Sequence, residues 1–196
     1  MSQLDETELV RRVGAGDENA FEELVRRHQR MVERLAARML PDARDREEVC
    51  QEVFLRVFRR IGEFRGESRL STWINSIAYR TCLNRLDGRR APVPGSQLGD
   101  GEGRGWFPDG IEAEVPSPAE RVERTEVRTV IERALAGLRP EYRAVITMYH
   151  LEELTVAEVS EATGLPEGTV KSHLYRARRE LKERLTEAVD IEELRR

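Results

Sequence analysis

Apolar residues recur at intervals of three and four along most of this 196-residue chain, and that spacing predicts α-helices rather than strands. Phe21, Leu24 and Met31 mark one face of a long helix, and similar stripes follow over residues 49–61 and 70–82. The sequence shows no strand of useful length and no internal repeat. We therefore predict an all-α protein.

A stretch rich in glycine and proline divides the chain in two. Residues 91–118 hold six glycines and five prolines, half of the 22 such residues in the sequence, together with five acidic residues and one arginine. Glycine and proline disfavour helix, so we predict a flexible acidic linker between two small helical domains, residues 1–90 and 119–196. In a free linker the apolar Trp106-Phe107 pair would be exposed to water. This favours docking of the pair on this chain or on a partner over a weak local cluster.

The segment from Leu154 to Leu185 predicts a helix-turn-helix. Thr155 and Glu158 have the spacing of a capping box, which begins a helix, and Gly164 supplies the left-handed residue that ends one. Pro166 then begins a longer helix that can lie in the major groove of DNA. An ordinary helical hairpin with a solvated basic face is the alternative. The polar face of the second helix comprises Thr169, Lys171, Ser172, Tyr175, Arg176 and Arg179.

Positive charge gathers in two islands although the net charge is −4. Residues 56–90 carry nine basic and three acidic side chains, and residues 169–184 carry six and two. Such local patches are the electrostatic footprint of phosphate binding, although a solvated charge run would explain either island alone. Gly168, in the first turn of the second helix, allows close approach of a phosphate to the backbone.

Several classes of protein are excluded. No apolar run approaches the ~18 residues of a membrane span, and the acidic start is not a signal peptide. Cys50 and Cys82 form no CxxC motif; we expect two small buried side chains in a reducing compartment. His28, His150 and His173 fall on three different predicted helices, with no cysteine at metal-ligand spacing. We expect no catalytic residue, metal or cofactor.

Four stretches, in order, resemble the extracytoplasmic-function sigma factors, which are small two-domain initiation factors of bacterial RNA polymerase. The resemblance covers residues 21–185 and implies that residues 1–90 correspond to sigma region 2 and residues 119–196 to sigma region 4. The stretches are Phe21-Glu22-Glu23-Leu24-Val25, the segment from Asp45 to Phe58, Phe64-Arg65-Gly66-Glu67-Ser68 with Thr72-Trp73-Ile74, and Leu165-Pro166-Glu167-Gly168-Thr169-Val170-Lys171-Ser172 with Arg176-Ala177-Arg178.

The resemblance gives an expected role to the polar side of the helix that follows Pro41. That side would bind a coiled coil of the largest polymerase subunit, whereas a solvated acidic face is the alternative from the residues alone. The same resemblance implies that Gly168 and the polar face of the second helix read the −35 promoter element. The expected polymerase-binding residues are Asp45, Glu48, Gln51 and Glu52.

The loop before residue 70 is expected to melt the −10 element. By resemblance, Phe64 and Ser68 hold a base pulled from the duplex, a step that needs a stacking surface and a pocket. Trp73 belongs to this expected site. From the residues alone, the alternative is that Phe64 and Trp73 simply pack in the core. Family members often carry asparagine at the position of Arg80, and a guanidinium only donates hydrogen bonds, so the base read there is left open. Arg65, Arg69 and Arg80 would lie near the DNA backbone.

The expected function is a transcription initiation factor of the bacterial cytoplasm that works by binding. The implied partners are core RNA polymerase, promoter DNA and an anti-sigma factor, with no membrane insertion; the linker threads toward a polymerase channel or is an inert tether. The principal alternative is a one-component or response-regulator-type helix-turn-helix regulator that binds a palindromic site as a dimer. That alternative explains only the last third of the chain. A sigma mimic that titrates a regulator is a third possibility.

Overall fold

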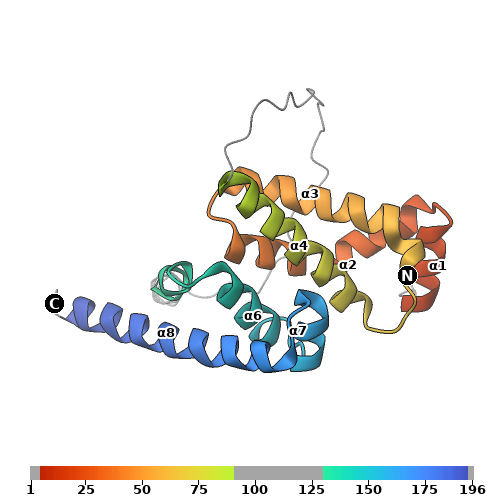
Figure 1. Ribbon diagram of the computed structural model, residues 1–196. Helices are drawn as coiled ribbons and strands as arrows, with labels where there is room; N and C mark the ends of the chain where they lie inside the picture. Colours follow the sequence, from red (N-terminus) through yellow and green to blue (C-terminus); the bar gives the residue numbers. More distant parts are fainter. Residues whose placement is uncertain (1–4, 91–129, 194–196) are drawn as a thin grey trace, which may run out of the picture.

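The computed structural model describes residues 5–90 and 130–193, and all regular secondary structure in these two ranges is helical (Figure 1). The all-α prediction is therefore confirmed for this part of the chain. The predicted linker, with its Trp106-Phe107 pair, lies outside the described residues.

The first group of helices comprises α1 (Glu6–Gly14), α2 (Glu18–Met39), α3 (Ala43–Arg60), the short 3-10 helix η1 (Ile61–Glu63) and α4 (Leu70–Arg90). Aspartates cap two of them. The Asp17 carboxylate accepts a hydrogen bond from the Ala20 N–H at 3.1 Å, and the Asp42 carboxylate accepts one from the Arg44 N–H at 2.8 Å. These bonds satisfy N–H groups that the helix itself leaves unpaired, so α2 and α3 begin where the sequence places a short acid.

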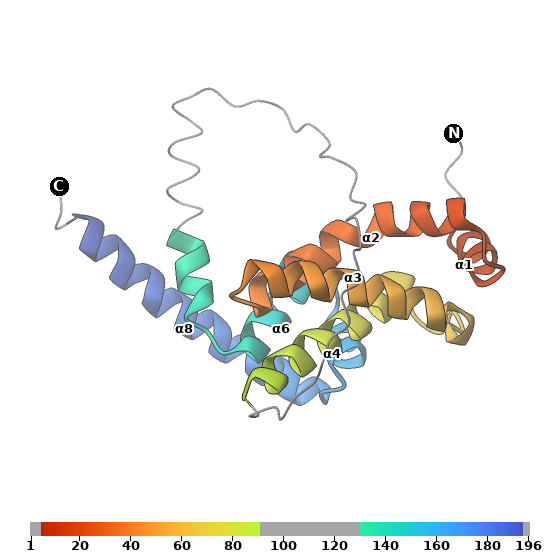
Figure 2. The ribbon, with the colours of Figure 1, turned by 90° about the horizontal axis from the view of Figure 1, so that it is seen from above.

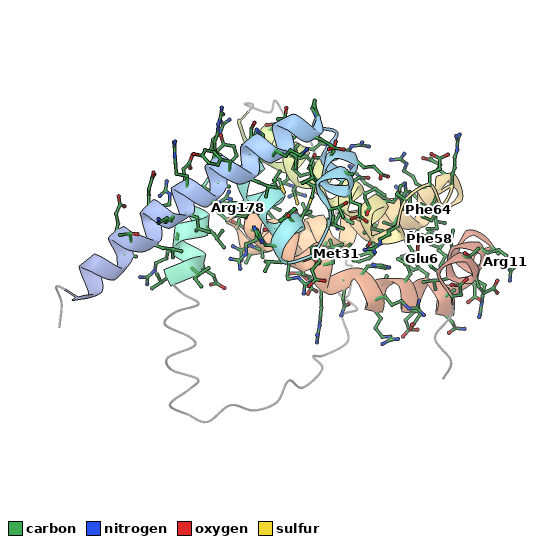
Figure 3. The ribbon with its side chains drawn as sticks, turned by 90° about the horizontal axis from the view of Figure 1, so that it is seen from below. Glu6, Arg11, Met31, Phe58, Phe64 and Arg178 are labelled. Carbon is green, nitrogen blue, oxygen red and sulfur yellow. The ribbon has the colours of Figure 1, made fainter. Side chains whose placement is uncertain are left out.

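The apolar stripes predicted from spacing form the core of this group. Leu24 and Leu35 of α2, Val53 of α3 and Ile74 of α4 are fully buried. The Glu6 carboxylate accepts a hydrogen bond from the Leu70 N–H at 3.1 Å, which joins the start of α1 to the start of α4 (Figure 3). Because α4 begins there, this bond also fixes one end of the loop that precedes it.

The second group comprises the helical residues 130–136, α6 (Pro140–His150), α7 (Val156–Thr163) and α8 (Glu167–Glu193). The predicted capping box is present: the Thr155 side chain accepts from the Glu158 N–H at 3.2 Å, while the Glu158 carboxylate accepts from the Thr155 N–H at 2.8 Å. Gly164 follows α7 in the left-handed conformation, with φ +73°. The helix-turn-helix predicted from these residues is thus confirmed.

The two groups pack against each other. Helix α2 lies against α6 and α4 lies against α7, and their buried side chains belong to one continuous apolar cluster (Figures 1 and 2). The Arg34 guanidinium donates to both Glu152 carboxylate oxygens, at 2.7 and 2.8 Å, and Arg143 donates to the Met39 carbonyl at 3.3 Å. The sequence predicted two domains but no contact between them, so this shared core is a finding of the structure.

Both cysteines are free and buried, as predicted. Cys50 is on α3 and Cys82 is on α4. Burial raises the pKa of each thiol to about 12, so the reactive thiolate is scarce at neutral pH. Among the helices of the two described ranges, none has the length and apolar character needed to cross a membrane.

The turn between α7 and α8 gives a matched pair of substitutions. Gly164→Ala should lower the free energy of unfolding by about 1–2 kcal/mol, because an added Cβ is strained in the left-handed conformation. Gly168→Ala should instead raise it by about 0.5–1 kcal/mol, because Gly168 is helical and no atom lies within 4 Å of the added Cβ. Urea denaturation followed by circular dichroism measures both. Equal effects of the two substitutions would contradict this account of the turn.

Candidate nucleic-acid interface

Helix α8 presents a polar face beside the turn of the helix-turn-helix. Its opposite face is anchored in the core, where Val170, Leu174 and Ala177 are buried. The polar face therefore points outward, and Tyr175 at its centre is 67% exposed. The structure brings together on this face the exposed residues that the sequence predicted: Lys171, Ser172, Tyr175, Arg176 and Arg179, with Gly168 and Thr169 in the first turn.

The cations of this face are held loosely. The Lys171 ammonium is 3.5 Å from the Glu167 carboxylate, and the Arg179 guanidinium is 3.6 Å from that of Glu183. Such exposed pairs stabilise by about 0–1 kcal/mol and are screened by salt, so they exchange readily for contacts with a polyanion. The Ser172 hydroxyl donates to the Gly168 carbonyl at 2.9 Å, which leaves its oxygen able to accept.

A small hollow lies in the loop between α3 and α4. The Phe64 and Trp73 rings meet at a centroid distance of 5.5 Å and an angle of 54°, and both line the hollow. Figure 3 labels Phe64. The hollow has a volume of about 210 Å³, and Trp73 also packs against the core. An aromatic wall beside a polar pocket can accept a stacked base. The lining consists of Glu63, Phe64, Arg65, Glu67, Ser68, Trp73 and Glu161.

Two predicted residues of this site lie outside the lining. Arg80 is exposed on α4, and Arg69 instead pairs with Glu158 of α7, with the Arg69 Nε 3.5 Å from a carboxylate oxygen. Hydrogen bonding from the Thr155 backbone lowers the pKa of Glu158, which keeps this carboxylate charged. With Glu161 in the lining, α7 places two acids against the loop that carries Arg65 and Arg69. Sequence spacing gave no signal for this contact, because the two segments are almost 90 residues apart.

The acidic side of α3 is held by an arginine of α4. The Arg85 guanidinium is 3.1 Å from the Asp45 carboxylate and 2.6 Å from that of Glu48. Hydrogen bonds from Arg85 and Arg44 lower the pKa of Glu48. Asp45 is only 5% exposed, whereas Gln51 is exposed to solvent. The four predicted residues thus differ in their exposure to solvent. Glu48, Gln51 and Glu52 reach the surface, whereas Asp45 is buried and pairs with Arg85.

The described parts of the chain offer no metal centre. Within residues 5–90 and 130–193, no three His, Cys, Asp or Glu side chains gather in an arrangement that could hold a metal ion. Burial lowers the pKa of His28, His150 and His173. These histidines are therefore mostly neutral at pH 7 and add little positive charge to either basic surface.

Comparison with known proteins matches both halves of the chain. Residues 24–91 match the family described as Sigma-70 region 2, and residues 128–181 match Sigma-70, region 4. The chain is 34% identical to the ECF RNA polymerase sigma-E factor of Escherichia coli K12 over 176 residues. This match covers 90% of this chain and 92% of that protein. It is 30% identical over 178 residues to the RNA polymerase sigma-H factor of Pseudomonas aeruginosa, covering 91% and 92%.

Solved structures share the fold at lower identity. CnrH, solved in complex with the cytosolic domain of CnrY, has a TM-score of 0.61 at 19% identity and covers 91% of this chain and 95% of its own. The sigma factor RpoE of Bartonella quintana, solved with the anti-sigma factor NepR, has a TM-score of 0.61 at 16% identity, covering 85% and 96%.

The Arg85 contact predicts a difference between two arginines that share one acceptor. Arg85→Ala should lower the free energy of unfolding by about 1–3 kcal/mol, because it removes a hydrogen-bond partner from the buried Asp45 carboxylate. Arg44→Ala should cost about 0–1 kcal/mol, because the Arg44 side chain is 87% exposed where it pairs with Glu48. Thermal and urea denaturation measure both. A larger loss from Arg44→Ala would refute the assignment.

Proposed function

This chain belongs to the extracytoplasmic-function group of the sigma-70 family, and we propose that it binds core RNA polymerase and directs it to a specific class of promoters. Transcription initiation is the role of the family. The observation that carries the proposal is the order of the two matched regions, in which region 2 holds a loop with Arg65 and Arg69 beside an aromatic wall and region 4 presents the basic exposed face of α8.

The two regions have different proposed functions. Residues 1–90 would bind polymerase and open the −10 element, and residues 119–196 would read the −35 element, with residues 91–118 as the connection. The face of α8 fits the major groove, where arginine and lysine donate to guanine and serine or threonine to several bases. Two weak DNA contacts held by one polymerase raise each other's effective concentration, so neither has to be strong alone.

We assign the polymerase contact to the exposed part of α3. Gln51 is exposed on one side of that helix, and the half-buried Glu48 and Glu52 reach the same side. Arg44 and Arg85 pair with Glu48, and Arg56 pairs with Glu52. Asp45 acts as a positioning residue in this proposal, because its buried carboxylate holds Arg85 and Arg85 in turn holds Glu48. The Asp45 side chain would shape this face without touching the polymerase.

The loop before α4 is the proposed site of base capture. Phe64 and Trp73 provide a stacking wall, and Ser68 can donate or accept a hydrogen bond at the edge of the hollow. Arg65 and Arg69 would contact phosphates on either side. Arg80 would lie along the DNA backbone on α4 rather than in the hollow, which agrees with its exposure and with its absence from the lining.

An anti-sigma factor is a further proposed partner. RpoE of Bartonella quintana was solved with an anti-sigma factor, and CnrH with the cytosolic domain of CnrY. The proposed location is the bacterial cytoplasm, where polymerase and chromosome are found. Members of the family act by binding, and we propose that this chain likewise has no catalytic activity of its own.

Transcription in vitro with core polymerase and a promoter library tests the proposal. The chain should confer a start-site preference on core polymerase and reveal the two promoter elements together. Sequence-specific binding of a palindrome by a dimer, without polymerase, would favour the regulator alternative instead. A core enzyme that ignored the chain would overturn the proposed function.

Arg176→Ala should weaken use of the −35 element by about 1–3 kcal/mol if its guanidinium contacts a base edge. The measurement is the relative yield from promoters with matched and mismatched −35 elements. Arg184→Ala is the matched control, because Arg184 is also an exposed arginine of α8 but lies beyond the polar face, about two turns from Arg176. Equal promoter discrimination by the two variants would count against this recognition face.

The acids of α7 predict that the free chain binds −10 DNA poorly. Replacing both Glu158 and Glu161 by Gln should strengthen binding of a single-stranded −10 oligonucleotide about two- to tenfold at low salt, because two negative charges are removed from beside the loop that carries Arg65 and Arg69. Glutamine keeps the capping box at position 158. Fluorescence anisotropy measures the affinity, with Glu18→Gln plus Glu22→Gln on α2 as the charge-matched control. No gain, or the same gain in the control, would rule out this electrostatic competition.

A further inference from the structure

A second and larger hollow lies away from the −10 loop. This apolar groove has a volume of about 750 Å³ and runs between the helical residues 130–136, α6 and the C-terminal half of α8. Its volume is within the range of about 300–1,000 Å³ that is usual for ligand sites. The apolar lining consists of Ile131, Leu135, Ile146, Leu151, Leu181 and Leu185.

Part of this lining is open to solvent. Leu151 is 48% exposed and Ile131 is 39% exposed, and Leu181 and Leu185 are half-buried. The predicted stripe of α8 is therefore buried from Val170 to Ala177 but only partly covered beyond it. An apolar patch of this kind marks an interaction surface.

The rim of the groove is positively charged. Arg38 of α2 and Arg178 and Lys182 of α8 all line it. Figure 3 labels Arg178. The Arg178 guanidinium donates to His150 Nε2 at 3.2 Å and lies 5.4 Å from the centre of the Tyr149 ring. Burial and the Arg178 charge lower the pKa of His150, so the charge of the rim comes from the two arginines and the lysine. The groove therefore favours an apolar group flanked by acids.

The chain itself contains a segment of that chemistry. Residues 91–118 contain two neighbouring aromatic residues, Trp106 and Phe107. Burying one aromatic side chain removes about 150–250 Å² of its surface from water. The acids that flank the pair are Asp100, Glu102, Asp109, Glu112 and Glu114, against the single cation Arg104.

The length of the connection allows the segment to reach the groove. Trp106 is 16 residues from Arg90, the last residue of α4, and 24 residues from Val130. At about 3.3 Å per extended residue, these arms span roughly 50 and 80 Å. The whole of α8, at 1.5 Å per residue, is about 40 Å long, so each arm is longer than that helix when extended. The arm that ends at Val130 reaches the chain beside Ile131, which lines the groove.

We propose that the acidic segment around Trp106-Phe107 docks in the apolar groove between residues 130–136, α6 and α8 of the same chain. The aromatic pair covers the exposed leucines, and the flanking carboxylates face Arg38, Arg178 and Lys182. Because Arg38 belongs to α2 and the other two cations to α8, the docked segment contacts both groups of helices. The polar face of α8 that carries Lys171 stays outside the groove.

Tryptophan fluorescence tests the proposal on the full chain. The sequence has two tryptophans, so Trp73→Phe leaves Trp106 as the only reporter. Its emission should be blue-shifted, and acrylamide should quench it several-fold less than it quenches a free peptide of residues 99–115. Adding Leu185→Glu, which keeps a good helix former on α8, should raise quenching to the level of the peptide. Arg178→Gln with Lys182→Gln should give an intermediate result.

A matched control shows whether the groove itself protects Trp106. Leu55→Glu places the same charge at a 54% exposed leucine of α3 and should leave Trp106 protected. Circular dichroism checks that each variant is folded. Quenching equal to that of the free peptide in the parent chain would overturn the proposal, as would protection that survives Leu185→Glu. Protection that rises with protein concentration would assign the groove to a second copy and would equally overturn it. None of these readouts depends on promoter activity.

Discussion

The arrangement of the whole molecule depends on the burial of α6 between the two groups of helices. Ala144, Val145 and Met148 are fully buried in the cluster that also contains the core of α2 and α4, while Tyr142 and Ile146 on the same helix pack toward α8. A helix that is apolar on both sides cannot remain beside only one neighbour without exposing the other side to water. The packing of α6 therefore joins the two groups of helices that the sequence predicted as separate domains. It also brings α7 against the loop before α4.

Electrostatics within the chain follows from that packing. Acids lie beside the arginines and lysine of both surfaces: Glu158 and Glu161 lie at the loop before α4, and Glu167 and Glu183 lie along α8. The two pairs on α8 are long and exposed, so they weaken steeply with salt and give way to a polyanion of higher charge density. Polymerase, by holding the two regions at the separation of two promoter elements, would replace the internal acids with phosphates.

Local features of the fold could be predicted from the sequence, whereas contacts between distant segments could not. The capping box at Thr155, the stop at Gly164 and the buried cysteines depend on neighbouring residues and on helical periodicity, and all are present. The pairing of Arg85 with Asp45 and of Arg34 with Glu152 joins helices across 40 and 118 positions. Many other arginines and acids have equivalent spacing, so charge alone does not select these pairs. Phe64, Arg65 and Ser68 lie together because they belong to one loop, and Trp73 follows in the first turn of α4. Arg69 instead pairs with Glu158, and Arg80 lies further along α4.

The length of α8 carries a last consequence. The start of the helix carries the exposed polar face and its end forms one wall of the groove, and Figure 2 shows its C-terminal half extending past the other helices. The fully buried residues of this helix lie between Val170 and Ala177, and Leu181 packs beside them. A chain that ended just before Leu185 would therefore lose part of the groove wall while keeping the polar face from Lys171 to Arg179.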